Sequence, residues 1–433
     1  MSDQEKIVLI GAGSLQFGLG AAGNIINSEV LEGSTICLHD IDKKKLGLIT
    51  QACKAAIEKD DLNYSLQSTT DLTQALENAS FIINSIEVGP RFELWDQDYE
   101  IPRKYGNKQV YGENGGPGGM FHSLRIIPPI LDICEEITKV CPDAFLINFS
   151  NPMSRICLAI HKKYPKLNFV GLCHEYHHHL PIIAKIIETD VSNLEVKAGG
   201  LNHFGVILDI KYKDSGKDAY PDIRKKGPHY LEDLNTLDGN NVMKFILKQY
   251  GYIPYTTDSH YGEYLHWAWD VVDIEGIKRF KETYKQSLAY ENKKIERLIR
   301  KGKGAQLVEP DEERAIPIIE GILTDSNHRE ASVNIPNDSI ISNLSDELVV
   351  ECPAIINKEG INGVPLGEFP ESLASLLTIQ GEVQKLVVKT VLTGTKETAI
   401  QALLADPVVN SFSAAHNMLD EILERQKEYI HLD

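Results

Sequence analysis

The sequence is poor in basic side chains relative to acidic ones. Lysine and arginine total 44 and aspartate and glutamate total 62 among 433 residues, so the formal net charge at pH 7 is −18. A surface of this sign repels the phosphate backbone of nucleic acids and the head groups of anionic membranes. We therefore expect no nucleic-acid or membrane partner, while a local basic pocket for an anionic small molecule stays compatible with the composition.

Long apolar runs and a disulfide pattern are also missing. No stretch of about 18 apolar residues occurs, so no transmembrane helix is predicted. The first residues, MSDQEKIVLIGAGS, lack the basic segment and cleavage pattern of a secretory signal. The seven cysteines are an odd number scattered along the chain, which indicates reduced thiols rather than a disulfide framework. These features predict a cytoplasmic protein.

Short apolar runs alternate with helical segments in the first half of the chain. The runs are Lys6–Ile10, Thr35–His39, Ser80–Ile86, Ala144–Asn148 and Asn168–Leu172. Runs of about five apolar residues are typical of strands that are buried on both faces of a parallel sheet. The alternation predicts an α/β fold with a doubly wound, Rossmann-type sheet.

The pattern changes after residue 195. Residues 196–214 alternate between apolar and polar and predict antiparallel strands, whereas residues 275–300 and 370–405 have helical spacing. The chain is long enough for two parts that each bury a core. We predict a Rossmann domain over residues 1–195 and an α+β domain over residues 196–433.

A glycine-rich loop, GAGSLQFG, follows the first predicted strand. Gly11, Gly13 and Gly18 permit a tight turn and a close approach of backbone N–H groups to a pyrophosphate. Asp40 ends the second run, where a carboxylate accepts hydrogen bonds from a ribose and favours NAD over NADP. The alternative is that the glycines only form a turn and Asp40 only caps a helix. We predict an NAD site whose other contacts are Ser14, Phe17 and Asn84.

Two further segments follow predicted strand ends, and a third comes about 30 residues later. They are NPMS at residues 151–154, GLCH at residues 171–174 and GLNHF at residues 200–204. A thiolate and an imidazole from separate segments can hold a divalent ion and leave positions open for substrate oxygens. Cys173 and His203 are therefore candidate metal ligands. The alternative for Cys173 is a small buried side chain, and we expect His177–His179 to serve packing or the surface.

The order and spacing of many motifs resemble glycoside hydrolase family 4, the NAD- and metal-dependent glycosidases. The matching segments span nearly the whole chain: GAGSLQFG, LHDID, TTDL, ENASFIINSIEVG, IPRKYG, GENGGPGGMFHSLRIIP, NFSNPM, GLCH, GLNHF, DSHYGEY, VNIPNDSIISNL and VVECPA. The resemblance implies a fold like that of lactate and malate dehydrogenases. It also implies that Cys173 and His203 bind a divalent ion, usually Mn²⁺, and that Gly11, Gly13 and Asp40 serve NAD.

The resemblance implies a reaction by transient oxidation instead of the two-carboxylate scheme of other glycosidases. NAD⁺ takes hydride from C3 of the sugar, and the resulting ketone acidifies the proton on C2. The metal stabilises the enolate as a Lewis acid while a base removes that proton and the aglycone is eliminated. Water then adds, and NADH returns the hydride.

Several residues are candidates for proton transfer and sugar binding, and some of them have a purely structural role as the alternative. Asp258 is the candidate C2 base, with a helix N-cap as its alternative, while His174 and Glu113 are candidates for proton transfer to the leaving oxygen. Arg125 is placed near the phosphates or the substrate, or else in an ion pair on a helix surface. The candidate sugar contacts are Asn151, Arg91, Asn202 and His260.

The substrate is left open between neutral and anionic glycosides. A histidine after the metal cysteine, His174, departs from the aspartate or asparagine of 6-phospho-glucosidases and favours non-phosphorylated α-galactosides, α-glucosides or uronides. Arg91 can pair with an anionic sugar, a uronide or a sulfoquinovoside, or else it is a solvated loop arginine.

Two other kinds of protein share the predicted cofactor loop. A 2-hydroxyacid or sugar dehydrogenase would need no metal pair, and an NAD-sensing regulator would need no intact site. The family resemblance further implies a homodimer or a homotetramer.

Overall fold

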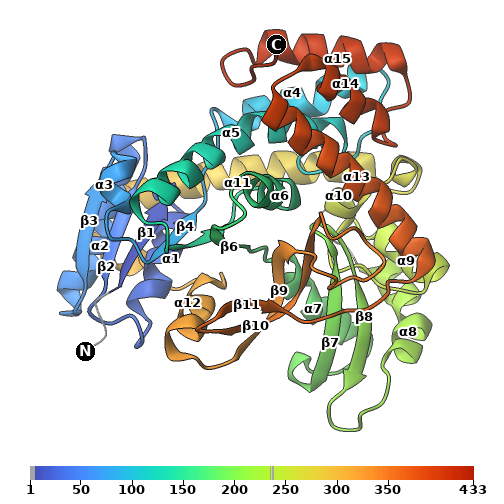
Figure 1. The fold of residues 1–433 in the computed structure, drawn as a ribbon. Helices are drawn as coiled ribbons and strands as arrows, with labels where there is room; N and C mark the ends of the chain where they lie inside the picture. Colours follow the sequence, from blue (N-terminus) through green and yellow to red (C-terminus); the bar gives the residue numbers. More distant parts are fainter. Residues whose placement is uncertain (1–4, 235, 237) are drawn as a thin grey trace.

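A single mixed sheet runs through the protein. The structure is a computed structural model that describes residues 5–234, 236 and 238–433. Within these residues the sheet has 11 strands in the order β3-β2-β1-β4-β5-β6-β9-β10-β7-β8, with β11 paired to β10. Figure 1 shows its two ends, with β1–β4 on one side of the molecule and the β7–β8 hairpin on the other.

The first six strands form the parallel part of the sheet. They are β1 (Lys6–Ile10), β2 (Thr35–His39), β3 (Ser65–Thr69), β4 (Phe81–Asn84), β5 (Phe145–Asn148) and β6 (Asn168–Gly171). Their order, 3-2-1-4-5-6, is that of a dinucleotide-binding Rossmann sheet. The carboxyl ends lie in one row, because Ile10 pairs with both His39 and Asn84, and Asn148 pairs with both Asn84 and Gly171. The loops that follow these strands therefore meet along one edge.

The remaining strands are antiparallel to their neighbours. They are β7 (Leu194–Leu201), β8 (Phe204–Tyr212), β9 (His328–Pro336), β10 (Val349–Asn357) and β11 (Gly360–Gly363). They join the parallel part where Gly171 of β6 pairs with Asn334 of β9. The turn between β7 and β8 consists of Asn202 and His203, so this hairpin presents the GLNHF segment.

Helices cover both parts of the sheet. The helices of the first half are α1 (Phe17–Ile26), α2 (Lys43–Lys59), α3 (Leu72–Leu76), α4 (Arg91–Lys104), α5 (Gly116–Val140), α6 (Met153–Lys163) and α7 (Glu175–Ile186). Those of the second half are α8 (Tyr220–Asp233), α9 (Asn241–Tyr250), α10 (Asp258–Tyr261), α11 (Ile274–Arg300), α12 (Ala315–Thr324), α13 (Glu371–Thr393), α14 (Lys396–Ala405) and α15 (Phe412–Arg425). None of the helices in the described residues is both long and apolar enough to cross a membrane.

The predicted α/β fold is confirmed, with one strand missed. Each of the five apolar runs contains a parallel strand, and residues 196–214 fall in the β7–β8 hairpin. The missed strand is β3, an edge strand with the sequence SLQST in which no residue is buried. Without a buried face it lacks the apolar signal of the central strands.

A buried ion pair fastens the carboxyl-terminal helices to the rest of the molecule. Arg125 of α5 donates to both carboxylate oxygens of Asp98 of α4 and, over 2.9 Å, to Gln426 at the end of α15. The alternative considered from the sequence was an exposed ion pair, whereas both side chains here are almost fully buried. Arg125 is therefore withdrawn as a phosphate or substrate contact, because its guanidinium is used in packing (Figure 1 shows α15 above α4 and α5).

Asp98→Ala should strongly destabilise the protein. The substitution leaves the Arg125 guanidinium buried without its counter-charge, a change that costs about 3–5 kcal/mol in comparable sites. The midpoint of urea unfolding measures the effect. Glu135→Ala, which breaks the exposed pair of Glu135 with Lys139, should leave the midpoint unchanged. Equal midpoints for the two variants would contradict a structural role for the buried pair.

Candidate active site

The glycine loop and Asp40 lie together at the carboxyl edge of β1 and β2. The backbone N–H of Gly13 donates to Oδ2 of Asp40 over 2.8 Å. A Cβ on Gly13 would lie 2.6 Å from that oxygen, and Gly11 has φ +84° and backs onto the carbonyl of Ser85. Only glycine fits at both positions when the loop lies this close to Asp40 and Ser85. Gly18, in the first turn of α1, lies against the carbonyl of Ala12 in the same way.

The other predicted cofactor contacts are only partly brought to this loop. Ser14 is exposed and Phe17 packs on Phe149, with 5.3 Å between ring centroids. Asn84 is fully buried, and its Nδ2 donates to Asn148 Oδ1 over 2.9 Å. Its side chain thus ties β4 to β5, so the structure does not support Asn84 as a direct side-chain contact to a cofactor. Ile41, which follows Asp40, was not predicted from the sequence to be a cofactor contact, although its apolar side chain is 90% exposed.

Cys173 and His203 converge from different parts of the chain. Cys173 follows β6, His203 lies in the β7–β8 turn, and 3.1 Å separates the Sγ and Nε2 atoms. Both side chains are buried. Burial and the neighbouring His260 lower the pKa of His203 to about 3, so its imidazole is neutral, as a metal ligand must be.

The surroundings of this pair suit a cation. Burial raises the pKa of the Cys173 thiol, and the carboxylates of Glu351 and Glu175 raise it further. A divalent ion would offset these buried negative charges and favour the thiolate. Across the residues that the structure describes, no cluster of three or more His, Cys, Asp or Glu side chains has the geometry of a metal site. The donor chemistry of Cys173 and His203 thus fits an ion that keeps coordination positions open for a substrate.

His260 and Glu113 line the space beside His203. The rings of His203 and His260 have their centroids 4.9 Å apart, and His260 Nε2 lies 3.8 Å from Glu113 Oε2. Burial lowers the pKa of His260, but Glu175 and Glu113 oppose this effect and the net direction is upward. Arg91 donates to Glu113 over 2.8 Å and also pairs with Glu87. The structure therefore brings Glu113, His260 and Arg91 together, with the arginine already paired to two carboxylates.

The remaining predicted residues flank the metal pair. Asn202 is buried, and its Nδ2 donates to Glu351 over 3.1 Å. Asn151 follows β5 and accepts from the backbone of Met153, at the start of α6. The side chain of His174 is 48% exposed and lies 3.8 Å from Glu313. His174 is thus about half exposed and directly follows Cys173 in the chain.

Asp258 is placed differently from the prediction. Its carboxylate is fully buried and accepts from the backbone N–H groups of Asn241, Val242 and Met243, in the first turn of α9. Burial raises the pKa of Asp258 to about 7, against the effect of these donors. Both oxygens are thus engaged by the first turn of α9, whose own N-cap residue is Asn240, and this placement speaks against Asp258 as the C2 base. The carboxylate satisfies a helix terminus, as its alternative proposed, but from outside the helix that it serves.

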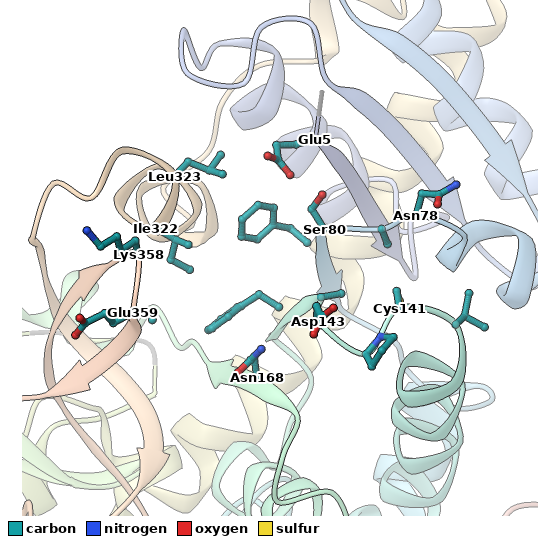
Figure 2. A pocket seen from close by; sticks show the side chains of 17 residues that line it. Glu5, Asn78, Ser80, Cys141, Asp143, Asn168, Ile322, Leu323, Lys358 and Glu359 are labelled. Atoms are coloured by element: carbon teal, nitrogen blue, oxygen red, sulfur yellow. The ribbon is translucent and has the colours of Figure 1, made fainter. Parts of the chain in front are cut away.

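A pocket of about 570 Å³ lies at the opposite edge of the parallel sheet. Figure 2 shows Glu5, Ser80 and Asn168, at the starts of their strands, across from Ile322 and Leu323 of α12. Neither the glycine loop nor the Cys173–His203 pair lines this pocket. The convergent chemistry is thus at the carboxyl edge, where open α/β sheets bind ligands.

Comparisons with known proteins agree with this arrangement. A model described as "Family 4 glycosyl hydrolase" matches residues 6–189, and one described as "Family 4 glycosyl hydrolase C-terminal domain" matches residues 198–409. The chain belongs to family 4 of the glycosyl hydrolases. An alpha-glucosidase of Erwinia rhapontici is 43% identical to it over 98% of both chains. This family 4 hydrolase is thus an enzyme of glycoside hydrolysis, which decides against the dehydrogenase and regulator alternatives.

Solved structures show the same fold at low identity. A 6-phospho-alpha-glucosidase from gut microorganisms, solved with NAD and Mn²⁺, superposes with a TM-score of 0.84 at 19% identity, over 100% of both chains. A malate dehydrogenase from Plasmodium falciparum superposes with a TM-score of 0.51 at 16% identity, over 90% of this chain and 98% of its own. The expected likeness to the dehydrogenase fold is confirmed.

Two buried carboxylates at the site were given no role from the sequence. Glu263 accepts from the backbone N–H of Asn114 over 3.0 Å, and burial raises its pKa to about 7. Glu351 accepts from Asn202, directly before the candidate metal ligand His203. A signal was present for Glu351, since it is a lone acid in the apolar run VVECPAII of β10, and a buried charge in a strand demands an explanation.

Asp258→Asn should keep most of the hydrolytic activity. Asparagine keeps one acceptor oxygen for the N–H groups of α9 and sets its amide group against the other, so it retains part of the cap, whereas it cannot remove a proton. We expect a rate within about tenfold of the wild type, while loss of a general base costs about 10²–10⁴-fold. Asp258→Ala should lower the unfolding midpoint, because α9 loses its cap. Loss of activity in Asp258→Asn with an unchanged midpoint would restore the base assignment.

Proposed function

We propose that this family 4 enzyme hydrolyses a non-phosphorylated α-glucoside, using NAD and a divalent metal, usually Mn²⁺. The observation that carries the cofactor proposal is the 3.1 Å approach of Cys173 to His203, on the same sheet edge as the Gly13–Asp40 contact. The sugar is supported by the alpha-glucosidase that is 43% identical over nearly the whole chain. When bound, NAD⁺ supplies a hydride acceptor for C3 of the sugar and the metal supplies a Lewis acid.

The residues of this chain divide the remaining tasks. Asp40 accepts from the adenine ribose of the dinucleotide, and the backbone of Gly11 and Gly13 admits its pyrophosphate. Cys173 and His203 hold the metal. Asn151 and Asn202 bind or orient the sugar.

Proton transfer falls to groups beside His203 and at the mouth of the site. We assign removal of the C2 proton to His260, which faces Glu113 over 3.8 Å and packs on His203. Glu113 orients that imidazole. His174, which is accessible and adjacent to Cys173, protonates the leaving oxygen.

The charges beside the site support a neutral sugar over an anionic one. Arg91 is paired with both Glu87 and Glu113, so its guanidinium is already engaged by two carboxylates. A phosphate or carboxylate on the sugar would have to compete with these acids for it. An anionic substrate, a uronide or a sulfoquinovoside bound by Arg91, is therefore the second candidate.

We also propose that residues 1–195 form the dinucleotide-binding part and residues 196–433 the substrate and oligomerisation part. The enzyme works in the cytoplasm as a homodimer or homotetramer in this proposal. The burial of all seven cysteines as free thiols supports a reducing compartment.

A panel of nitrophenyl glycosides tests the function. It contains α- and β-glucosides, α-galactosides, uronides, sulfoquinovosides and 6-phosphoglucosides, each assayed with and without NAD⁺ and Mn²⁺ under reducing conditions. We expect the α-glucoside to be hydrolysed fastest and only with both additions. In D₂O its product glucose should carry deuterium at C2, and His260→Gln should lose both hydrolysis and exchange. Net NADH formation without hydrolysis would overturn the proposal in favour of a dehydrogenase, and hydrolysis without NAD⁺ would overturn the oxidative route.

Gly13→Ala should weaken NAD⁺ binding by at least about tenfold, that is by 1.4 kcal/mol or more. The added methyl group would lie 2.6 Å from Asp40 Oδ2 and would force the acid or the loop aside. Quenching of protein fluorescence on NAD⁺ addition gives the dissociation constant. Gly47→Ala in α2 is the matched control, because nothing lies within 4 Å of its added Cβ. An unchanged dissociation constant in Gly13→Ala would place the dinucleotide elsewhere.

A further inference from the structure

Glu351 is a buried carboxylate for which the proposed reaction has no task. It lies in the middle of β10 (Val349–Asn357) and is 1% exposed, with Val350 and Cys352, both fully buried, on either side. Burying a carboxylate costs several kcal/mol unless hydrogen bonds and a counter-charge offset the cost. The residues that bind the Glu351 carboxylate therefore indicate its role.

Both hydrogen-bond partners of Glu351 are neutral. Its Oε2 accepts from Asn202 Nδ2 over 3.1 Å, and its Oε1 accepts from the hydroxyl of Ser332 on the neighbouring strand β9. These donors satisfy the oxygens but leave the negative charge without a cationic partner. Through its bond to Asn202, that carboxylate contacts the turn that carries His203.

The contact with Asn202 connects Glu351 to the second metal ligand. Asn202 directly precedes His203 in the β7–β8 turn. Its backbone N–H donates to Ser154 over 3.1 Å and its carbonyl accepts from Tyr264 over 3.0 Å. With the bond to Glu351, the turn is held at three points, so the direction of the His203 imidazole depends on them. Partners behind the ligands commonly set the orientation and affinity of a metal site.

We propose that Glu351 is the outer carboxylate of the metal site, which orients the Asn202–His203 turn and supplies negative charge that increases the affinity of Cys173 and His203 for a divalent cation. The inference rests on the proposed function, because it takes Cys173 and His203 as the ligands. Glu351 is a positioning residue in this scheme and touches neither sugar nor cofactor.

The test is the Mn²⁺ affinity of the metal-free, full-length protein without NAD⁺ or substrate, measured from the electron paramagnetic resonance signal of free Mn²⁺. We expect Glu351→Gln to weaken binding by about 10–100-fold, as the loss of comparable outer partners does. Glu330→Gln is the matched control. Glu330 is also 1% exposed, on β9, but its partners are Arg314 and His177. This control should keep the wild-type affinity within about threefold, a difference of less than 1 kcal/mol.

A second readout separates a role at the metal from a loss of folding. In the Co²⁺-loaded protein, the thiolate-to-metal absorption band should shift in Glu351→Gln and stay in place in Glu330→Gln. Glu351→Asp, which keeps the charge but does not reach Asn202, should bind Mn²⁺ with intermediate affinity. If the glutamine variant does not fold, the aspartate variant carries the test, and wild-type affinity in it would overturn the proposal.

Cys173→Ser distinguishes failure of this inference from failure of the proposed function. Unchanged Mn²⁺ affinity in Cys173→Ser would remove the metal site itself, and the inference with it. Loss of affinity in Cys173→Ser together with wild-type affinity in Glu351→Gln would overturn the role of Glu351 alone.

Discussion

The architecture depends on the junction of the two parts of the sheet at Gly171. This residue ends β6, pairs with Asn334 of β9, and is followed two positions later by Cys173. A Cβ at residue 171 would lie 2.5 Å from the Met153 sulfur and 2.6 Å from that of Cys157, so helix α6 sits against a bare backbone. This close packing of α6 against the end of β6 fixes where the chain leaves the sheet. It therefore also fixes the position of the Cys173 thiol, which faces His203. A larger residue there would move Cys173 and the sheet junction together.

The carboxyl edge of the sheet brings two kinds of chemistry into one row. The pairing of Ile10, Asn84, Asn148 and Gly171 fixes the loops after four parallel strands relative to one another. The glycine loop leaves from the first of these ends and Cys173 follows the last. The proposed oxidative elimination needs a hydride acceptor and a Lewis acid beside one sugar, and this edge is where the residues proposed to hold both groups come together.

The parts of this arrangement that were predictable are those with a local signal. The central strands are recognisable in the sequence as apolar runs. Gly11 and Gly13 are recognisable because the turn after the first strand requires glycine, and Asp40 because it ends the second strand. The pairing of Cys173 with His203, 30 residues apart, came from the resemblance of ordered motifs and not from either segment alone. By contrast, β3 has no buried face. Asp258 caps a helix that begins 17 residues before it in the chain, and Arg125 finds Asp98 and Gln426 on two other helices. Contacts between residues far apart in the chain leave no local sequence pattern. The sequence around Asp258 therefore gave no sign that its carboxylate binds the first turn of α9, and it was predicted to be a base.

The segment between residues 309 and 314 contacts both α1 and α7. Gly20 and Gly23 of α1 leave room for it, since a Cβ on Gly23 would lie 2.4 Å from the backbone of Glu309. Asn24 of α1 bonds both the side chain and the backbone of Asp311, and Glu312 pairs with His178 of α7, over 3.4 Å. One short stretch of chain therefore contacts the helix that follows the glycine loop and the helix that follows Cys173. The proposed reaction places hydride transfer and proton removal on adjacent carbons of one sugar ring, so it requires the two half-sites to keep a constant separation. The register of the strands provides that constraint. The packing of this segment on α1 supplements it, whereas the exposed pair with α7 adds little.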